Sequence, residues 1–191
     1  SGLQAGDIII NSETLNVNDV TSLKISDTDD SVHLSRQEGS WVVSNRDNYK
    51  ADFSKISRVL KKLIEIRVAE QLKAGASTYS RFDLSDPKEG SDSEGAGTRV
   101  QLFKSNNESA SVELIVGKRF GGATVDSGQQ GGGNGKYLRL GGNENQVFIV
   151  ADSLYDIESS TSSWLEKNPF SIDKPKNILV THSDEQKFNF T

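Results

Sequence analysis

The most constraining feature of this sequence is a hydrophobic pattern near the N-terminus that returns near the C-terminus. The opening pattern consists of Val17, residues 23–25 and, after an acidic turn, residues 32–34. The same order returns, with almost the same spacing, at Ile172, residues 178–180 and residues 188–190. Self-similarity at a fixed spacing is the signature of repeated structural units. The sequence therefore predicts one complete unit followed by the opening hairpin of a second.

Bulk composition excludes several classes of protein. The chain has 191 residues, 34% hydrophobic residues and a formal net charge of −5, which fits one large domain with generous loops. An acidic chain without a basic stripe is not a general nucleic-acid binder. The absence of cysteine excludes a disulfide scaffold and thiolate-bound zinc. No run of apolar residues is long enough to span a membrane.

One segment predicts an amphipathic helix. Asp52 is a good N-cap, and the apolar residues that follow it keep helical spacing. They are Phe53, Ile56, Val59, Leu60, Leu63 and Ile64, with Val68 and Leu72 extending the pattern. The expected helix has about 20 residues and a length of roughly 30 Å.

The strand signals come in two groups. Three short alternating segments before the helix predict an antiparallel meander at residues 20–25, 32–34 and 41–43. Two hairpins are predicted after the helix, one from residues 100–103 and 112–116 and one from residues 136–140 and 147–150. A loop at residues 85–98 and a short helix at residues 151–158 are also expected. The predicted fold class is α+β, with an antiparallel meander and hairpins packed on one long amphipathic helix.

These patterns divide the chain into three parts. Residues 1–16 are expected to be a disordered lead-in or the remnant of a tag. Residues 17–170 form the α+β repeat unit, and residues 171–191 form the first hairpin of a second, truncated unit. The chain starts without Met, so we expect that an upstream signal or anchor helix has been removed.

None of the candidate sites in the sequence matches a known functional motif. Residues 131–136 resemble a phosphate loop, but Lys136 is followed by Tyr137 and a strand, where a Ser or Thr and a helix are required. The acidic residues at 27–30 and 92–94 lack the spacing of a calcium loop and read as solvated turns. The two histidines, His33 and His182, have no evident partner. We therefore predict no catalytic, cofactor-binding or metal-binding residues, no cofactor and no enzymatic activity.

The two tryptophans leave an alternative open. Trp41 and Trp164 could be stacking platforms for sugars, or they could anchor the core. Each lies beside aliphatic residues, which favours the core. A concave pocket that contains both rings and two facing carboxylates would indicate a secreted ligand-binding or hydrolytic domain instead.

Several short segments, in their order along the chain, resemble a known family. They are residues 38–43, 49–52, 59–63, 80–84, 114–118, 137–139, 147–149 and 164–165. Over residues 17–170 this order resembles the bacterial family called domain of unknown function 4340. The resemblance implies an N-terminal membrane anchor ahead of an extracytoplasmic region, encoded near components of gliding-type ABC transporters. The family has no established catalytic residues, and the glycine-rich stretch 121–135 departs from its usual pattern.

The expected function follows from the composition and this resemblance. We expect a non-catalytic binding or assembly module on the outer side of a bacterial membrane, accessory to an ABC transporter. Its partner would be an envelope protein, recruited through exposed sheet edges by strand addition. We also expect self-association through residues 178–190, and no binding to nucleic acid. The alternative is a secreted domain that binds carbohydrate or peptide, or that hydrolyses it.

Overall fold

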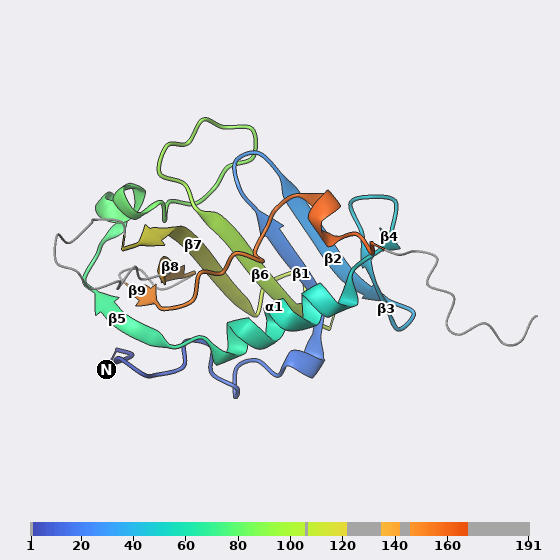
Figure 1. The fold of residues 1–191 in the computed structure, drawn as a ribbon, viewed down its shortest axis with the longest axis horizontal. Helices are drawn as coiled ribbons and strands as arrows, with labels where there is room; N and C mark the ends of the chain where they lie inside the picture. The colour runs from blue at the N-terminus through green and yellow to red at the C-terminus, as the bar shows by residue number, and fades with distance from the viewer. Residues whose placement is uncertain (1, 106, 122–134, 142–145, 168–191) are drawn as a thin grey trace, which may run out of the picture.

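The computed structural model describes residues 2–105, 107–121, 135–141 and 146–167. In these residues nine strands form one antiparallel sheet, and one α-helix, α1 (Phe53–Glu65), lies across a face of it (Figure 1). The α+β class with antiparallel pairing is therefore confirmed. The strands are β1 (Val20–Ser26), β2 (Ser31–Gln37), β3 (Ser40–Val43), β4 (Tyr49–Lys50), β5 (Val68–Leu72), β6 (Thr98–Lys104), β7 (Val112–Phe120), β8 (Gly135–Leu140) and β9 (Val147–Val150). Short 3-10 helices occur at η1 (Val17–Asp19), η2 (Ala76–Phe82) and η3 (Thr161–Trp164).

The sheet joins the two predicted groups of strands into one layer. Its order is β4-β3-β2-β1-β6-β7-β8-β9-β5. The predicted meander forms β1 to β3, and the two predicted hairpins form β6-β7 and β8-β9. The groups meet where β1 pairs with β6, from Val20 opposite Lys104 to Ser26 opposite Arg99. A bulge after Val20 shifts the alternation, so that Val20 joins the core together with Leu23 and Ile25.

The helix α1 begins as predicted. The side chain of Asp52 accepts a hydrogen bond from the backbone N–H of Lys55 at 3.1 Å, which caps the first turn. Its buried stripe has the spacing of one helix face and consists of Ile56, Val59, Leu60 and Leu63. This stripe packs against the sheet in the main hydrophobic cluster.

The helix is shorter than predicted. It ends at Glu65 after 13 residues, and Val68 and Leu72 lie in β5. From Ile66 onward the burial alternates, because Ile66 and Val68 are buried whereas Arg67 between them is exposed. β5 pairs with β9, and its start also pairs with the N-terminal segment. This backbone pairing on both sides, with β-branched residues at alternate positions, outweighs the helical spacing.

The helix α1 links the two outermost strands, β4 and β5 (Figure 1). Its length is about 20 Å, whereas the gaps between nine strands amount to roughly 38 Å. The helix therefore covers only about half the width of the sheet. Two extended segments cover much of the rest: the N-terminal residues and the residues after β9, here called the strap (residues 151–160). They contribute Ile9, Ile10, Leu15 and Leu154 to the main cluster, and η3 beyond the strap contributes Trp164.

Residues 2–16 are therefore part of the fold, which corrects the expectation of a disordered lead-in. Ile9, Ile10 and Leu15 are each at most 6% exposed. The backbone N–H of Ile9 donates to Ile66 at 3.1 Å, and Ile8 forms an isolated bridge with Arg67. Ile8 and Ile9 thus pair with the link from α1 to β5, and Ile9 and Ile10 belong to the main hydrophobic cluster.

The strap is not the short helix that the sequence predicts at residues 151–158. Asp152 accepts a hydrogen bond from the backbone N–H of Leu154 at 2.8 Å, two residues on, which closes a turn instead of capping a helix. Leu154 has a φ of 49°, a left-handed conformation that is strained for a bulky residue. Its side chain is 3% exposed, so burial in the core offsets this strain.

Each edge of the sheet is partly covered by another segment of the chain. Beside β4, Ala51 bridges Leu165, and the Asp52 N–H donates to the Trp164 carbonyl at 2.8 Å. The Glu166 N–H donates in return to the Lys50 carbonyl at 3.1 Å. Beyond β5, Gly6 N–H donates to Val68 at 2.8 Å, and Val68 N–H donates to Asp7 at 2.9 Å. The chain itself thus occupies part of each edge, and partner recruitment by strand addition stays a prediction.

Two expectations concern parts of the chain at its C-terminal end. Residues 171–191, in which the second repeat is predicted, lie outside the described residues, and so do residues 178–190, through which self-association is predicted.

Among the described residues no helix combines the length and the apolar character needed to cross a membrane.

Candidate functional site

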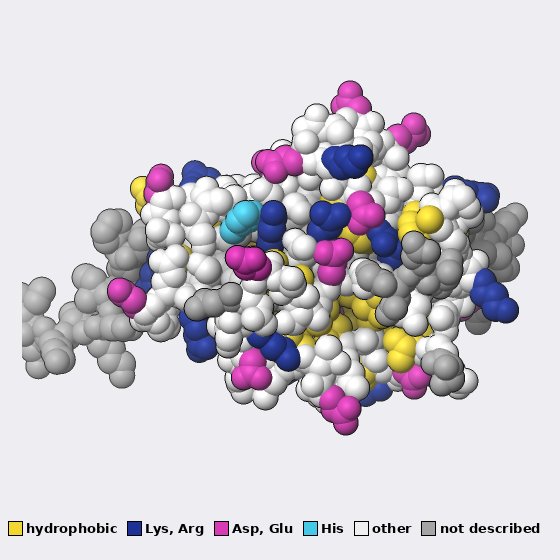
Figure 2. All heavy atoms as spheres, turned by 180° about the vertical axis from the view of Figure 1, so that it is seen from behind, with side chains coloured by type: hydrophobic (Ala, Val, Ile, Leu, Met, Phe, Trp, Pro, Cys, Tyr) yellow, Lys and Arg dark blue, Asp and Glu magenta, His cyan; other side chains and the backbone are white. Residues whose placement is uncertain are grey.

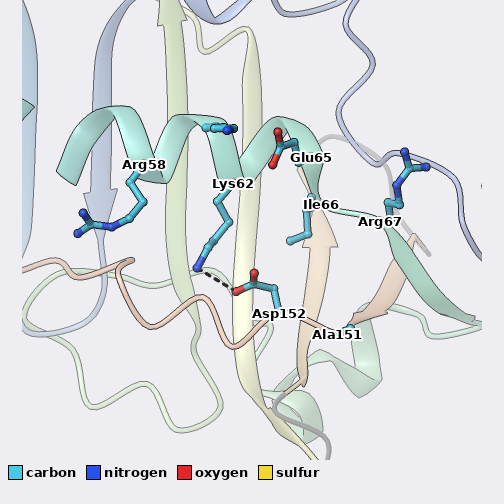
Figure 3. Close-up of a pocket in the computed structure, with 8 residues that line it drawn as sticks. Arg58, Lys62, Glu65, Ile66, Arg67, Ala151 and Asp152 are labelled. Carbon is cyan, nitrogen blue, oxygen red and sulfur yellow. Dashed lines mark ion pairs between the residues drawn. The ribbon is translucent and has the colours of Figure 1, made fainter. Parts of the chain in front are cut away.

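A groove lies between the C-terminal half of α1 and the start of the strap (Figure 3). Its volume is about 580 Å³. The helix supplies one wall, the end of β9 and the strap supply the other, and the link from α1 to β5 closes one end. The lining residues are Arg58, Lys61, Lys62, Glu65, Ile66, Arg67, Ala151 and Asp152.

Three ion pairs hold the strap antiparallel to α1. Lys62 pairs with Asp152 at 3.3 Å, and Arg58 pairs with Asp156 at 3.0 Å. Lys55, one further turn toward the start of the helix, pairs with Glu158. The residue numbers of the helix partners fall from 62 to 55 as those of the strap partners rise from 152 to 158, so the two segments run in opposite directions. These three ion pairs are here called the ladder.

The ladder differs in strength along its length. The Lys55 side chain is 9% exposed; its ammonium also donates to the Ser163 carbonyl at 3.1 Å and lies 4.5 Å from the Trp164 ring centre. A buried ammonium requires such partners, because its desolvation is costly. The hydrogen bond with Asp156, together with the charge of that carboxylate, raises the pKa of Arg58. The Arg58 side chain is half exposed, so this pair is screened by water.

The groove keeps a positive balance after these pairs form. Lys61 has no ion pair among the described residues, and Arg67 donates only to the Gly6 carbonyl, at 2.7 Å. Glu65, the other acidic residue of the lining beside Asp152, also has no ion pair among the described residues. Beside the groove, the Lys62 ammonium lies 4.9 Å from the ring centre of Tyr155, which is 69% exposed. Exposed aromatic rings and cationic side chains are common at recognition surfaces.

The chemistry of the groove lining is that of charged side chains. Its ionisable side chains are lysine, arginine and carboxylate, with no serine, threonine or histidine among the lining residues. No group of three or more His, Asp or Glu side chains suitable for a metal ion occurs in the described part of the chain. The arrangement is that of a groove lined mainly by charged side chains.

A second candidate surface is the opposite face of the sheet, where β2, β1 and β6 are uncovered (Figure 2). The strand register places His33, Lys24, Gln101 and Glu113 in one row across it. Two hollows of about 640 and 360 Å³ on this face share Lys24 and Phe103 as lining residues. Charges of both signs are interspersed here, so this face lacks the one-signed excess of the groove.

The loop at residues 85–98 is tied to this face by a buried arginine. Arg139 on β8 is 7% exposed; it donates to the Leu84 carbonyl at 3.0 Å and lies over the Tyr79 ring. Asp86 meets both Arg139, at 3.1 Å, and Arg99, at 2.9 Å. Partial burial would raise the pKa of Asp86, but these two arginines lower it overall. The cluster therefore has a structural role in fastening the loop.

The residues that the sequence singled out do not come together in one site. Trp41 and Trp164 are 6% and 0% exposed, and both belong to the core. His33 lies on the uncovered face, as the alternation predicts, whereas His182 lies outside the described residues. Of the glycine-rich stretch and Lys136, the structure describes residues 121 and 135–136, and Lys136 lies in β8.

The acidic turn after β1 is a structural turn. The Asp27 side chain accepts hydrogen bonds from the backbone N–H groups of Asp29 and Asp30, both at 2.9 Å, and from the Ser159 hydroxyl of the strap. Partial burial would raise the pKa of Asp27, but these hydrogen bonds lower it overall. The second acidic cluster, at Asp92 and Glu94, is exposed. Sequence reasoning missed the groove because its strap residues read as a helix.

These observations define an α+β domain that is built on one antiparallel sheet and carries a charged groove. The chain belongs to the family described as Domain of unknown function (DUF4340), whose model matches residues 41–191. The match starts in β3 and continues beyond residue 170, to the last residue. Comparisons with the curated proteins and with the solved structures each found no match.

Proposed function

We propose that this chain is a non-catalytic binding module that acts through the groove beside α1. The observation that carries the proposal is the positive balance of the groove lining, where Lys61 and Arg67 have no ion pair among the described residues, on a chain of net charge −5. The exposed Tyr155 ring lies next to this lining, at Lys62. Aromatic and arginine side chains contribute most of the binding energy at protein interfaces. A rigid helix and a core-anchored strap hold the groove, so little ordering would be needed on binding.

The cellular role that we propose is assembly at the bacterial envelope. In this proposal the full protein is anchored to the membrane through an N-terminal segment, lies on the extracytoplasmic side and serves as an accessory to an ABC transporter. Membership of this family, together with what the sequence resemblance implies about its members, supports this role. The proposal also includes the second repeat, for which residues 171–191 would supply the first hairpin.

The two tryptophans weigh against the alternative of a secreted ligand-binding or hydrolytic domain. That alternative required both rings in a concave pocket with facing carboxylates. Trp41 and Trp164 are buried in the core instead, and neither lines the groove. Two buried tryptophans favour the binding module over this alternative.

Site-specific photo-crosslinking in cells that produce the full-length protein tests the proposal. A photoreactive amino acid is placed at Lys61 or Tyr155 in the groove region, and at Lys88 or Tyr49 as matched exposed controls elsewhere. The two groove positions should give the same crosslinked envelope protein, identified by mass spectrometry. Crosslinks of equal yield at all four positions, or none at the groove positions, would contradict the proposal.

A further inference from the structure

We propose that the groove takes an acidic, extended segment of a protein partner. This inference rests on the proposed function and specifies the chemistry of the partner. Four cationic and two anionic side chains line the groove. One of the two carboxylates, Asp152, is already engaged by Lys62, at 3.3 Å. Arg58 is likewise engaged by Asp156, at 3.0 Å. The lining charges without an ion pair among the described residues are therefore Lys61, Arg67 and Glu65, two positive charges and one negative.

The strap itself shows how an acidic segment binds to α1. Its carboxylates at Asp152, Asp156 and Glu158 each meet one cation on successive turns of the helix. The strap is extended rather than helical, so its side chains can reach the helix at several points along its length. A partner segment with the same chemistry would find a second set of cations, Lys61 and Arg67, beside the set that the strap uses.

The spacing of the cations suits an extended chain. Along α1, Lys61 lies one turn beyond Arg58, and Arg67 follows where the chain leaves the helix for β5. Lys61 and Arg67 are six positions apart in the sequence, which corresponds to a backbone distance of about 10–12 Å along the helix and the link. An extended peptide covers that distance with about three or four residues, so carboxylates at alternate positions can meet both cations.

Tyr155 and Ile66 supply the apolar part of the interaction. Tyr155 is 69% exposed, and its ring is held by the ammonium of Lys62. Ile66 is 5% exposed and forms part of the groove lining. An apolar side chain of the partner would pack on the exposed Tyr155 ring, flanked by the charged contacts, as at interfaces that have an aromatic anchor and a polar rim.

Peptide binding to the whole chain tests this inference. The probe is a fluorescein-labelled peptide of alternating Asp and Ser, about ten residues long and hence extended enough to cross the groove. Its neutral match has Asn in place of Asp. We expect the acidic peptide to bind more weakly as salt is added. The double variant Lys61→Glu/Arg67→Glu should weaken its binding about tenfold, because two attractions become repulsions.

Controls separate charge recognition from other causes. Lys88→Glu reverses an exposed lysine outside the groove and should leave binding unchanged. Lys61→Glu alone should weaken binding by a smaller factor and retains the contact between Arg67 and Gly6. Equal binding of the neutral peptide, or equal binding by the double variant, would overturn the inference. The inference would also be overturned if the double variant lost binding to vesicles of anionic phosphatidylglycerol but kept its binding to the acidic peptide.

The two tests can fail separately. If crosslinking at Lys61 and Tyr155 captures one envelope protein but the acidic peptide does not bind, the binding function stands and its acidic specificity falls. If the peptide binds through Lys61 and Arg67 but no partner is captured in cells, the chemistry of the groove stands and the proposed cellular role falls.

Discussion

Replacing Trp164 tests whether the strap is an integral part of the fold. The Trp164 side chain is 0% exposed, donates its indole N–H to the Glu158 carbonyl at 2.8 Å and lies beside the Lys55 ammonium. Trp164→Ala removes the buried ring, its hydrogen bond to Glu158 and its contact with the Lys55 ammonium. The structure offers a matched control on the strap itself, because Tyr155 is also aromatic but is 69% exposed.

The expected cost follows from burial. A large aromatic side chain hides about 150–250 Å², which at about 25 cal/mol/Å² corresponds to about 4–6 kcal/mol. Truncation of buried Trp to Ala costs about 3–5 kcal/mol, a large share of the roughly 5–15 kcal/mol that stabilises a domain. For Tyr155→Ala the loss is about 0.5–1 kcal/mol, since only a surface cation–π contact disappears.

Urea unfolding of both variants, followed by tryptophan fluorescence or circular dichroism, measures the difference. With a slope of about 2 kcal/mol per molar urea, Trp164→Ala should lower the midpoint by about 2 M and Tyr155→Ala by less than about 0.5 M. If the two variants shift the midpoint equally, the strap is not anchored in the core by Trp164. The rigid groove wall on which the proposals depend would then lose its support.

Two further predictions concern α1 and the uncovered face. Leu63→Asp should unfold the domain, because a charge would enter a position that is 0% exposed, whereas Ser57→Asp on the exposed side of α1 should leave the thermal midpoint unchanged. Partial burial and the charge of Lys24 lower the pKa of His33 below 6.5, against a smaller opposing effect of Glu89. The unfolded chain therefore binds a proton more readily, so stability should fall as the pH drops through 6.5 and level off below the folded-state pKa. His33→Gln should flatten this part of the stability profile measured by urea titration, and an unaltered profile would contradict the assignment.

Local signals in the sequence predict most of the strands correctly. The hairpins β6-β7 and β8-β9 and the meander β1 to β3 all follow from alternation and turn residues that lie close together in the chain. The start of α1 follows from Asp52, whose capping bond depends only on neighbours. Such features are readable because their stabilising contacts are local.

The strand β5 and the strap escaped prediction because distant segments decide them. The helical spacing from Ile64 to Val68 and Leu72 is real, but β5 is fixed by its pairing with β9 and with residues 6–9. In the strap, Asp152 could begin a helix or close a turn, and the choice depends on cations far away on α1. The groove forms where these two misread segments meet, so the sequence gives no direct signal for it.

The position of β1 and β2 in the sheet has a consequence for how the domain can be divided. These strands precede residue 41, where the family match begins, yet they lie between β3 and β6 in the middle of the sheet. Without them, the matched segment would consist of two separate pieces of sheet whose facing edges have no partner. Closing the sheet also requires Val20 to meet Lys104, so the central seam can form only after residue 104 has left the ribosome. The cooperative folding unit thus begins well before the segment by which the family is recognised.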